Sequence, residues 1–271
     1  MSKLTIIQKL EQFKKILRPS VYDYIPLIFT DFTEFHGDRR FGDDPAIVGG
    51  IARLGPSADQ RPVTIIAQAR GRNIEEFQKT NNAQPQPEGY RKALRLAKQA
   101  EKFHRPVICF IDTPGAYPGT GAEERGQGEA IARNLLEFMT LRTPVISVVL
   151  GEGGSGGALA LGVCDELALL ENALYSVISP RGCASILWKD AGREKEAAEQ
   201  LKITAEDLLA FGVCEHIIPE SEGGAQTNVK ETAANIAAYL HDALGRFAGR
   251  DPASLQETRY AKFRKIGVFL E

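Results

Sequence analysis

The sequence predicts an α/β protein in which helices cover both faces of a sheet with parallel strands. From residue 87 onward, short apolar runs, glycine-rich turns and helical segments recur in the same order three times. The strands, such as "VICFID" at 107–112 and "VISVVL" at 145–150, are continuously apolar, as expected of strands buried on both faces. Helices between such strands imply parallel crossovers and a layered α/β architecture.

The composition is that of an ordinary globular protein and gives no sign of a nucleic-acid or membrane partner. The 271 residues are 43% hydrophobic and 25% charged, with a formal net charge of −2. No apolar run approaches the roughly 18 residues of a membrane span. The N-terminus lacks the continuous apolar stretch of a signal peptide. We therefore expect a cytoplasmic protein.

The spacing of cysteine and histidine predicts no metal site on this chain. The cysteines form no C-x-x-C pair, and the histidines have no metal-ligand spacing. Cys109, Cys164 and Cys214 lie in apolar surroundings, which predicts buried, reduced thiols. Cys183 follows Gly182 in a turn and fits this interpretation less well.

Three features precede the recurring units. Apolar residues at helical spacing predict an amphipathic helix over residues 3–17, ended by Pro19. After a turn-rich segment, apolar runs at 46–54 and 63–70 predict a hairpin. The polar segment at 74–87 is irregular after its first turn and is expected to be a mobile loop.

The later elements follow the strand–turn–helix order. Strands are expected at 107–112, 145–150 and 166–178, and helices at 87–104, 122–141, 157–165, 183–190 and 228–247. The first of these helices carries a row of basic residues, for which a solvated face is a better interpretation than a phosphate site. These residues are Arg91, Lys92, Arg95, Lys98 and Lys102. The basic end at 259–271 either packs on a partner or is solvated.

The stretch "GEGGSGG", which begins at residue 151, is the strongest functional signal, and three motifs overlap in it. Gly151, Gly153 and Gly156 form the G-x-G-x-x-G of a dinucleotide-binding turn. Gly153, Ser155 and Gly157 form G-x-S-x-G, the nucleophile elbow of α/β-hydrolases. Consecutive backbone N–H groups at a strand-to-helix turn also make an oxyanion hole. Close packing without any ligand is a further explanation.

The surroundings of this stretch favour the oxyanion hole. A dinucleotide-binding turn normally opens its domain, whereas this stretch lies past the middle of the chain, behind another glycine-rich turn, "TPGAYPGTG". The contexts of His216 and His241 show no pairing of a catalytic base with an orienting acid. The remaining feature is a pair of glycine-lined turns at the ends of adjacent strands. Backbone N–H groups in such turns can stabilise a negatively charged oxygen.

Long motifs of the chain resemble one family. From about Tyr24 to about Pro219 the order "DDPAIVGGIARL", "PEGYRKALRLAKQAEKF", "FIDTPGAYPGTGAEERGQGEAIARNL", "LGEGGSGGALALG" and "SPRGCASILWKD" is similar to the α subunit of the bacterial acetyl-CoA carboxylase carboxyltransferase. The resemblance implies a crotonase-like fold, a superhelix of ββα units with flanking N- and C-terminal helices. We expect an N-terminal helix at 1–20, the carboxyltransferase domain at 21–225 and a helical extension of that domain at 226–271.

The resemblance also implies a reaction and its partners. The family moves the carboxyl group of carboxybiotin, held on the biotin carboxyl carrier protein, to acetyl-CoA and forms malonyl-CoA, the first committed step of fatty acid synthesis. A β subunit with a zinc ribbon holds most of the acyl-CoA. The active enzyme is therefore expected to be an α2β2 assembly, within a larger complex that includes biotin carboxylase, and no metal is implied on this chain.

Site residues carry over from the family by motif. Gly156 and Gly157 are the expected backbone donors to the biotin ureido oxygen, where negative charge gathers as CO₂ leaves. Deprotonated biotin can accept the methyl proton, so no side-chain base is required. The residues expected to line the biotin and substrate pocket are Gly153, Gly154, Ser155, Gly115, Ala116, Tyr117, Pro118, Gly119 and Gly71.

Two motifs depart from the family pattern. Arg181 stands where the family usually has a glutamate, and "AQARGRN" replaces the more usual His-Gln-Lys-Gly while keeping the turn glycine and a positive charge.

Glu123 and Glu124 are better explained by the preference of acidic residues for a helix N-terminus than by catalysis. A serine hydrolase that uses Ser155, and a non-catalytic paralogue or scaffold, stay open as alternatives.

Overall fold

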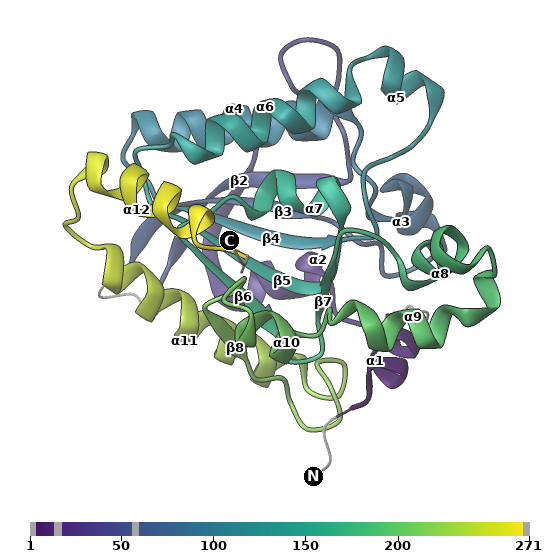
Figure 1. Ribbon diagram of the computed structural model, residues 1–271. Helices are drawn as coiled ribbons and strands as arrows, with labels where there is room; N and C mark the ends of the chain where they lie inside the picture. Colours follow the sequence, from purple (N-terminus) through teal and green to yellow (C-terminus); the bar gives the residue numbers. More distant parts are fainter. Residues whose placement is uncertain (1–3, 14–17, 56–59, 268–271) are drawn as a thin grey trace.

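An eight-stranded mixed sheet forms the centre of the molecule (Figure 1). The computed structural model describes residues 4–13, 18–55 and 60–267. The strand order is β1–β2–β3–β4–β5–β6–β8, and β7 pairs with the end of β5. The strands are β1 (Phe29–Glu34), β2 (Ile47–Leu54), β3 (Arg61–Gln68), β4 (Val107–Thr113), β5 (Val145–Gly154), β6 (Glu166–Leu170), β7 (Leu174–Ser176) and β8 (His216–Ile218).

The strand directions divide the sheet into two parts. β1, β2 and β3 pair antiparallel, and β2 and β3 form the hairpin that the sequence predicts. From β3 onward every neighbouring pair is parallel. All seven residues of β4 are buried, as the continuous apolar run indicates. The carboxyl ends of β3, β4 and β5 therefore meet at one edge, where the candidate site lies.

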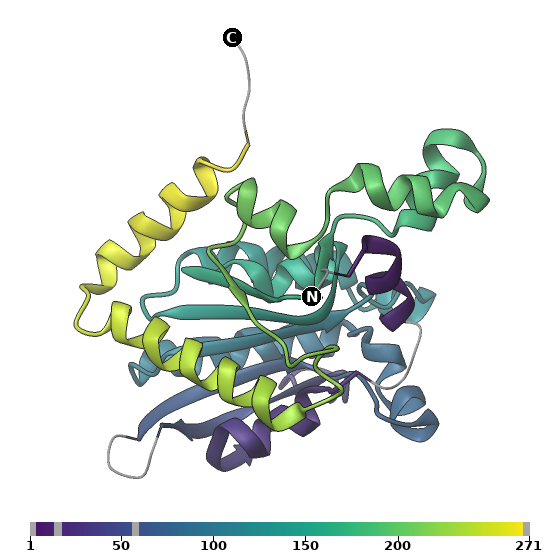
Figure 2. The same cartoon turned by 90° about the horizontal axis from the view of Figure 1, so that it is seen from below.

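Helices cover both faces of the sheet, so the predicted α/β class is confirmed. On one face lie α4 (Pro87–Lys102), α6 (Gln127–Met139) and α7 (Ser155–Gly162) (Figure 1). On the other face α2 (Val21–Ile28) and α11 (Val229–Phe247) contact each other (Figure 2). Among the described residues, no helix is long and apolar enough to cross a membrane.

The remaining helices surround this core. They are α1 (Ile6–Phe13), α3 (Ile74–Lys79), η1 (Asn81–Ala83), α5 (Thr120–Glu124), α8 (Pro180–Trp188), η2 (Ala191–Arg193), α9 (Glu194–Leu201), α10 (Ala205–Ala210) and α12 (Pro252–Arg264). α8 and α9 pack on each other and extend away from the sheet, and α1 contacts α9 (Figures 1 and 2). Of the helix predicted at residues 3–17, α1 covers the centre, while residues 3 and 14–17 lie outside the described part.

Several local predictions are wrong, each for a physical reason. The helix predicted at 122–141 is two helices, because Gly126 adopts a φ of +85° and separates α5 from α6. The strand predicted at 166–178 is interrupted by a turn, and its second part, β7, pairs with β5 instead of extending β6. The polar segment after residue 74 contains the short helices α3 and η1.

The basic residues of α4 are not all solvated, contrary to the prediction. Lys92 is buried, and its ammonium group donates to the Asp43 carboxylate at 2.5 Å. Arg91 is largely buried too and binds the Asp38 carboxylate at 2.8 Å. The basic C-terminal end is likewise partly internal. Arg259 of α12 is fully buried against Asp165, at 2.6 Å.

The four cysteines are free and buried, which confirms the prediction of buried, reduced thiols and extends it to Cys183. Burial raises the pKa of Cys109 and Cys164 above the ordinary thiol value and that of Cys214 to about 11. These three thiols therefore stay protonated and unreactive at neutral pH.

Candidate active site

The glycine stretch continues β5 and leads directly into α7, without an intervening loop. Gly151, Gly153 and Gly154 belong to β5, and Ser155 is the first residue of α7. Within this stretch Gly153 pairs with Thr113 of β4 on one side and with Tyr175 of β7 on the other. Neighbouring strands thus hold the start of α7 from both sides.

Close approach of other atoms requires glycine at four of the five positions. A Cβ atom placed on Gly153 would lie 2.4 Å from the Tyr175 ring, and one on Gly151 would lie 2.7 Å from the Asp112 carboxylate. On Gly154 it would lie 2.2 Å from the carbonyl oxygen of Pro114, and on Gly157 it would lie 2.5 Å from the backbone nitrogen of Ala116. Gly156 is the exception, since its nearest neighbour, Ile131, would be 3.6 Å away. Tight packing therefore accounts for more of this motif than sequence reasoning allowed.

The turn after β4 is rigid and lies against the start of α7. The Thr113 hydroxyl donates to the carbonyl of Gly115 at 2.8 Å and accepts from its N–H at 3.0 Å. Further along, the N–H of Tyr117 donates to the carbonyl of Pro85, and the buried Gln127 amide donates to both Pro85 and Tyr117 carbonyls. These contacts fix the turn, and the close approaches of Gly154 and Gly157 join it to α7.

The start of α7 presents backbone N–H groups that the helix itself does not use. The first N–H groups of any α-helix have no acceptor within the helix. Here the N-cap residue is Gly154, which provides no side-chain cap. The N–H groups of Gly156 and Gly157 therefore have no acceptor within the helix at its positive end, which favours binding of a negatively charged oxygen.

A pocket of about 60 Å³ opens beside these residues. Its lining comes from α1, β5, the first residue of α7, β7, the start of α8 and the segments that follow β4, β7 and α9. These residues are Leu10, Pro114, Glu152, Gly153, Gly154, Ser155, Leu174, Ser176, Ile178, Ser179, Pro180 and Ile203. A volume of this size holds a few water molecules and is too small for a bicyclic ligand.

The structure brings most of the predicted site residues together, at different depths. Gly153, Gly154 and Ser155 line the pocket. Gly156 and Gly157 form the next part of the α7 turn, and Gly115 and Ala116 pack against Gly157. Tyr117, Pro118 and Gly119 follow along the same turn, and Pro118 is exposed. Gly71 is placed elsewhere. It follows β3, where a Cβ would lie 2.2 Å from the Phe77 nitrogen, so its role is to let the chain pack on α3.

Sequence reasoning missed the buried polar residues that support the site. Gln68 and Tyr90 both donate to the carbonyl of Gly157, at 2.7 and 3.3 Å. Arg70 binds the carboxylate of Glu152, a pocket residue, at 2.9 Å. The one available signal was that Gln68 is a polar residue in the otherwise apolar run "IIAQA".

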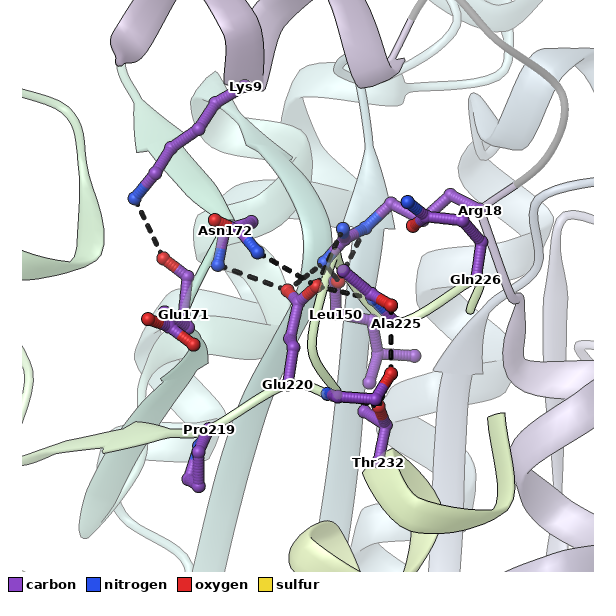
Figure 3. Close-up of polar contacts among 12 residues, drawn as sticks. Lys9, Arg18, Leu150, Glu171, Asn172, Pro219, Glu220, Ala225, Gln226 and Thr232 are labelled. Carbon is purple, nitrogen blue, oxygen red and sulfur yellow. Dashed lines mark hydrogen bonds and ion pairs between the residues drawn. The ribbon is translucent and has the colours of Figure 1, made fainter. Parts of the chain in front are cut away.

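A second buried ion pair fixes the strand just before the glycine stretch. Figure 3 shows the Arg18 guanidinium between the carbonyl of Leu150 and the carboxylate of Glu220. Burial alone would raise the pKa of Glu220, but Arg18, Asn172 and the N–H of Ala225 hold it below its ordinary value. Lys9 of α1 donates to the carbonyl of Glu171, the residue after β6 (Figure 3). The N-terminal segment is thereby tied to the strands next to the pocket.

The geometry does not assemble a serine hydrolase. Ser155 has a φ of +54°, a strained value for a non-glycine residue that also occurs at nucleophile elbows. However, among the described residues no hydrogen bond joins it to a histidine. His216 stacks on the Tyr239 ring, and His241 is exposed beside Asp242. Within the same residues no cluster of three or more His, Cys, Asp or Glu could hold a metal ion.

Glu123 and Glu124 are exposed in the short helix α5, of which Glu124 is the last residue, so the expected position at a helix N-terminus is wrong for Glu124. Glu123 lies in its first turn, where its charge favours the helix N-terminus. Neither residue lines the pocket. Arg181 is exposed on α8, beside the pocket residues Ser179 and Pro180 but not among the lining residues.

Comparisons with known proteins agree with the fold and identify the family. The family described as acetyl co-enzyme A carboxylase carboxyltransferase-like matches residues 1–267. The acetyl-coenzyme A carboxylase carboxyl transferase subunit alpha of Shouchella clausii is 59% identical over 92% of this chain and 76% of its own length. That of Clostridium acetobutylicum is 54% identical over 99% of this chain and 96% of its own length.

Solved structures extend the comparison at lower identity. Transcarboxylase 12S, determined with methylmalonyl-coenzyme A bound, has a TM-score of 0.69 and 22% identity, covering 88% of this chain and 42% of that chain. A chain of the Pseudomonas malonate decarboxylase hetero-tetramer, determined with coenzyme A, has a TM-score of 0.62 and 18% identity, covering 83% of this chain and 90% of its own length. At these identities the likeness shows a shared fold.

The strand ends, the helix N-terminus and these likenesses define a protein of the crotonase-like class that carboxyltransferases use. Within that class, the chain belongs to the acetyl-CoA carboxylase carboxyltransferase family, among the alpha subunits. The resemblance seen in the sequence motifs is thereby confirmed, and with it a carboxyl transferase function.

Proposed function

We propose that this chain forms, together with a β subunit, the enzyme that transfers the carboxyl group of carboxybiotin to acetyl-CoA and yields malonyl-CoA. The observation that carries the proposal is the N-terminus of α7, where Gly154 provides no side-chain cap and Ser155, the first helical residue, lines the pocket. The coenzyme A ligands named for the structural neighbours support an acyl-CoA substrate. We place this chain in the cytoplasm, with fatty acid synthesis as its context.

The chain's part in the reaction is to stabilise charge. When bound, carboxybiotin supplies the CO₂ unit and afterwards the basic nitrogen that accepts the methyl proton of acetyl-CoA. The N–H groups of Gly156 and Gly157 would donate to the ureido oxygen, which would carry negative charge once the CO₂ unit has left. Loss of one such donor typically costs about 3–4 kcal/mol of transition-state stabilisation. Ser155, Gly153 and Gly154 form the pocket wall, and the turn of residues 115–119 supports it from behind.

The β subunit completes the site from outside. A pocket of about 60 Å³ cannot enclose biotin and acyl-CoA, so a second surface is needed. Next to the pocket, Val177, Ile186 and Leu187 expose apolar side chains on β7–α8, each by more than 60%. Exposed apolar residues that cluster beside an incomplete site are typical of a subunit interface. We assign this surface to the zinc-ribbon β subunit in an α2β2 assembly. The biotin carboxyl carrier protein and biotin carboxylase are the further partners.

The reverse reaction tests this proposal directly. The chain is co-expressed with its β subunit, and the purified complex is assayed for malonyl-CoA-dependent carboxylation of biocytin. We expect activity from the complex and none from either subunit alone. The proposal would be contradicted if the folded complex failed to carboxylate biocytin with every short malonyl-type CoA tested. A chain that hydrolyses esters alone and reacts with a fluorophosphonate at Ser155 would favour the hydrolase instead.

A further inference from the structure

Gln68 connects three parts of the site although it is completely buried. It is the last residue of β3 and has no solvent-exposed surface. Its side-chain N–H donates to the carbonyl of Gly157 in α7 at 2.7 Å. Its side-chain oxygen accepts from the backbone N–H of Asp112 in β4 at 3.2 Å. One amide therefore links the ends of β3 and β4 to the first turn of α7.

The network continues from Asp112 into the pocket wall. The Asp112 carboxylate accepts from the N–H of Glu152 in β5 at 3.0 Å. The Glu152 carboxylate, which lines the pocket, pairs with Arg70, two residues after Gln68. The chain of contacts thus returns to the segment in which it begins. Each member fixes another, and the Nε of Arg70 also lies 3.5 Å from the Asp112 carboxylate, although within the described residues that Nε has no hydrogen-bond partner.

The carbonyl that Gln68 holds belongs to one of the two proposed donor residues. A second buried group, the hydroxyl of Tyr90 in α4, donates to the same carbonyl at 3.3 Å. Burial raises the pKa of Tyr90 well above the ordinary value, so its hydroxyl keeps its proton and remains a donor. Two buried donors on one carbonyl fix the first turn of α7, and with it the direction of the neighbouring N–H groups.

We propose that Gln68 is a positioning residue for carboxyl transfer, which aims the backbone N–H groups of α7 at the developing charge through its bond to Gly157. This inference rests on the proposed function. Gln68 touches neither pocket nor substrate, so its effect belongs to kcat and leaves substrate affinity unchanged. Misplacement of a preorganised site by an ångström costs up to about a hundredfold in rate.

The test is the pH dependence of a Gln68→Glu variant in the complex with β. An ionised carboxylate has no proton to donate to Gly157, whereas a protonated carboxyl group has one. Burial beside a carbonyl oxygen favours the protonated form, so protonation occurs within the accessible pH range. We expect kcat for biocytin carboxylation about tenfold or more below that of the unaltered complex at pH 8. The ratio of the two kcat values should rise toward one as the pH falls to about 6, with KM for malonyl-CoA unchanged.

Gln68→Leu is the matched control, because it removes both hydrogen bonds and has no proton to regain. Its kcat should be low at every pH. If the Glu and Leu variants lose the same activity at all pH values, Gln68 only fills the core, and the inference is overturned. An inactive unaltered complex would instead contradict the proposed function, so the two failures are distinguishable.

If the Gln68 variants do not fold, Tyr90→Phe tests whether the hydrogen bonds to the Gly157 carbonyl affect kcat. It removes only the second donor on the Gly157 carbonyl and keeps the ring in the core. We expect kcat to fall about threefold, with the melting temperature and KM little changed, because a single neutral hydrogen bond is lost. A Tyr90→Phe complex with unaltered kcat would then overturn the inference.

Discussion

At the scale of single residues, the site depends on backbone groups that side chains hold in place. The N–H groups at the start of α7 are available because Gly154 cannot cap them. The approach of Pro114 and Ala116 is close because Gly154 and Gly157 have no Cβ. A backbone site of this kind needs no histidine or catalytic carboxylate, which agrees with the position of both histidines of the hydrolase hypothesis away from Ser155.

Substitution of Ser155 separates the backbone strain at this residue from the contribution of its hydroxyl to activity. Its φ of +54° costs a non-glycine residue about 1 kcal/mol, so Ser155→Gly should raise the free energy of unfolding by up to that amount. Because the backbone N–H groups remain, the rate of biocytin carboxylation should fall less than tenfold. A tenfold fall is about the effect of losing one hydrogen bond. Chemical unfolding and the carboxylation assay measure both effects. Complete loss of activity in both Ser155→Gly and Ser155→Ala would mean that the hydroxyl itself is essential.

The sequence predicted the positions of the important glycines, but not the contacts that require glycine there. It located the glycine stretch, but not that Gly157 meets Ala116, or that Gln68 reaches across 89 residues to bind it. Such contacts depend on the strand order, which the local sequence does not state. Gly157→Val is therefore expected to abolish activity by disturbing the fold, so it cannot separate a catalytic role from a scaffold role.

At the scale of elements, the turn before β2 is fixed by one carboxylate. Asp38 accepts from the N–H groups of Arg40, Phe41 and Gly42 and binds Arg91 of α4. Burial raises the pKa of Asp38, but these hydrogen bonds outweigh it and hold the pKa at about 2. The turn and α4 are thereby joined by a group that is charged only above that pH.

Asp38→Asn should lower the free energy of unfolding by about 2 kcal/mol at pH 7. The folded-state pKa lies below the unfolded value of about 4. The stabilisation is therefore complete above pH 4 and disappears as the pH falls toward 2. Urea unfolding at pH 7 and pH 3 measures this, with the difference between variant and unaltered chain smaller at pH 3. A difference that is the same at both pH values would contradict the assignment.

α12 is attached to the core by a buried ion pair. Arg259 binds the Asp165 carboxylate and also donates to carbonyls of Phe138, Leu141 and Thr143. Arg259→Met should lower the free energy of unfolding by about 3 kcal/mol, because it leaves Asp165 charged and buried without its partner. Arg264→Met, on an exposed position of the same helix, is the control and should change little. Equal stability of the two variants would show that α12 is held by other contacts.

The sequence predicted which elements exist better than where they end. Helical spacing and apolar runs gave the hairpin, α4 and α11, because those signals are local. The break at Gly126 and the separate pairing of β7 were not predicted, since a backbone φ value and a strand partner are not visible in local spacing. The charges of α4 looked solvated, and the place of those of α12 stayed open, because their acidic partners lie far away in the sequence, 49 residues for Lys92 and 94 for Arg259.

At the scale of the whole molecule, the chain presents half of a site and a surface next to it. The predicted division at residues 20 and 225 stays a prediction, and so does the assembly with β. Ile186→Asp on α8 should raise the dissociation constant for the β subunit at least tenfold, because it places a charge in an apolar contact. Tyr260→Asp, at another exposed position, on α12, is the control. Titration calorimetry with purified β measures both, and equal affinities would place β elsewhere.

The central claim is that backbone N–H groups at the start of α7 stabilise the charge that develops during carboxyl transfer. Gly156 allows a direct test because a Cβ there meets nothing closer than 3.6 Å. Gly156→Pro removes its N–H at a first-turn position, where helices tolerate proline, and Gly156→Ala adds bulk but keeps the N–H. Both variants are assayed in the complex with β, after their melting temperatures show that they are folded.

We predict that kcat for biocytin carboxylation falls about 10²–10³-fold in Gly156→Pro and by far less in Gly156→Ala. Equal activity of the two folded complexes would contradict the claim, because the N–H of Gly156 would then take no part in the reaction.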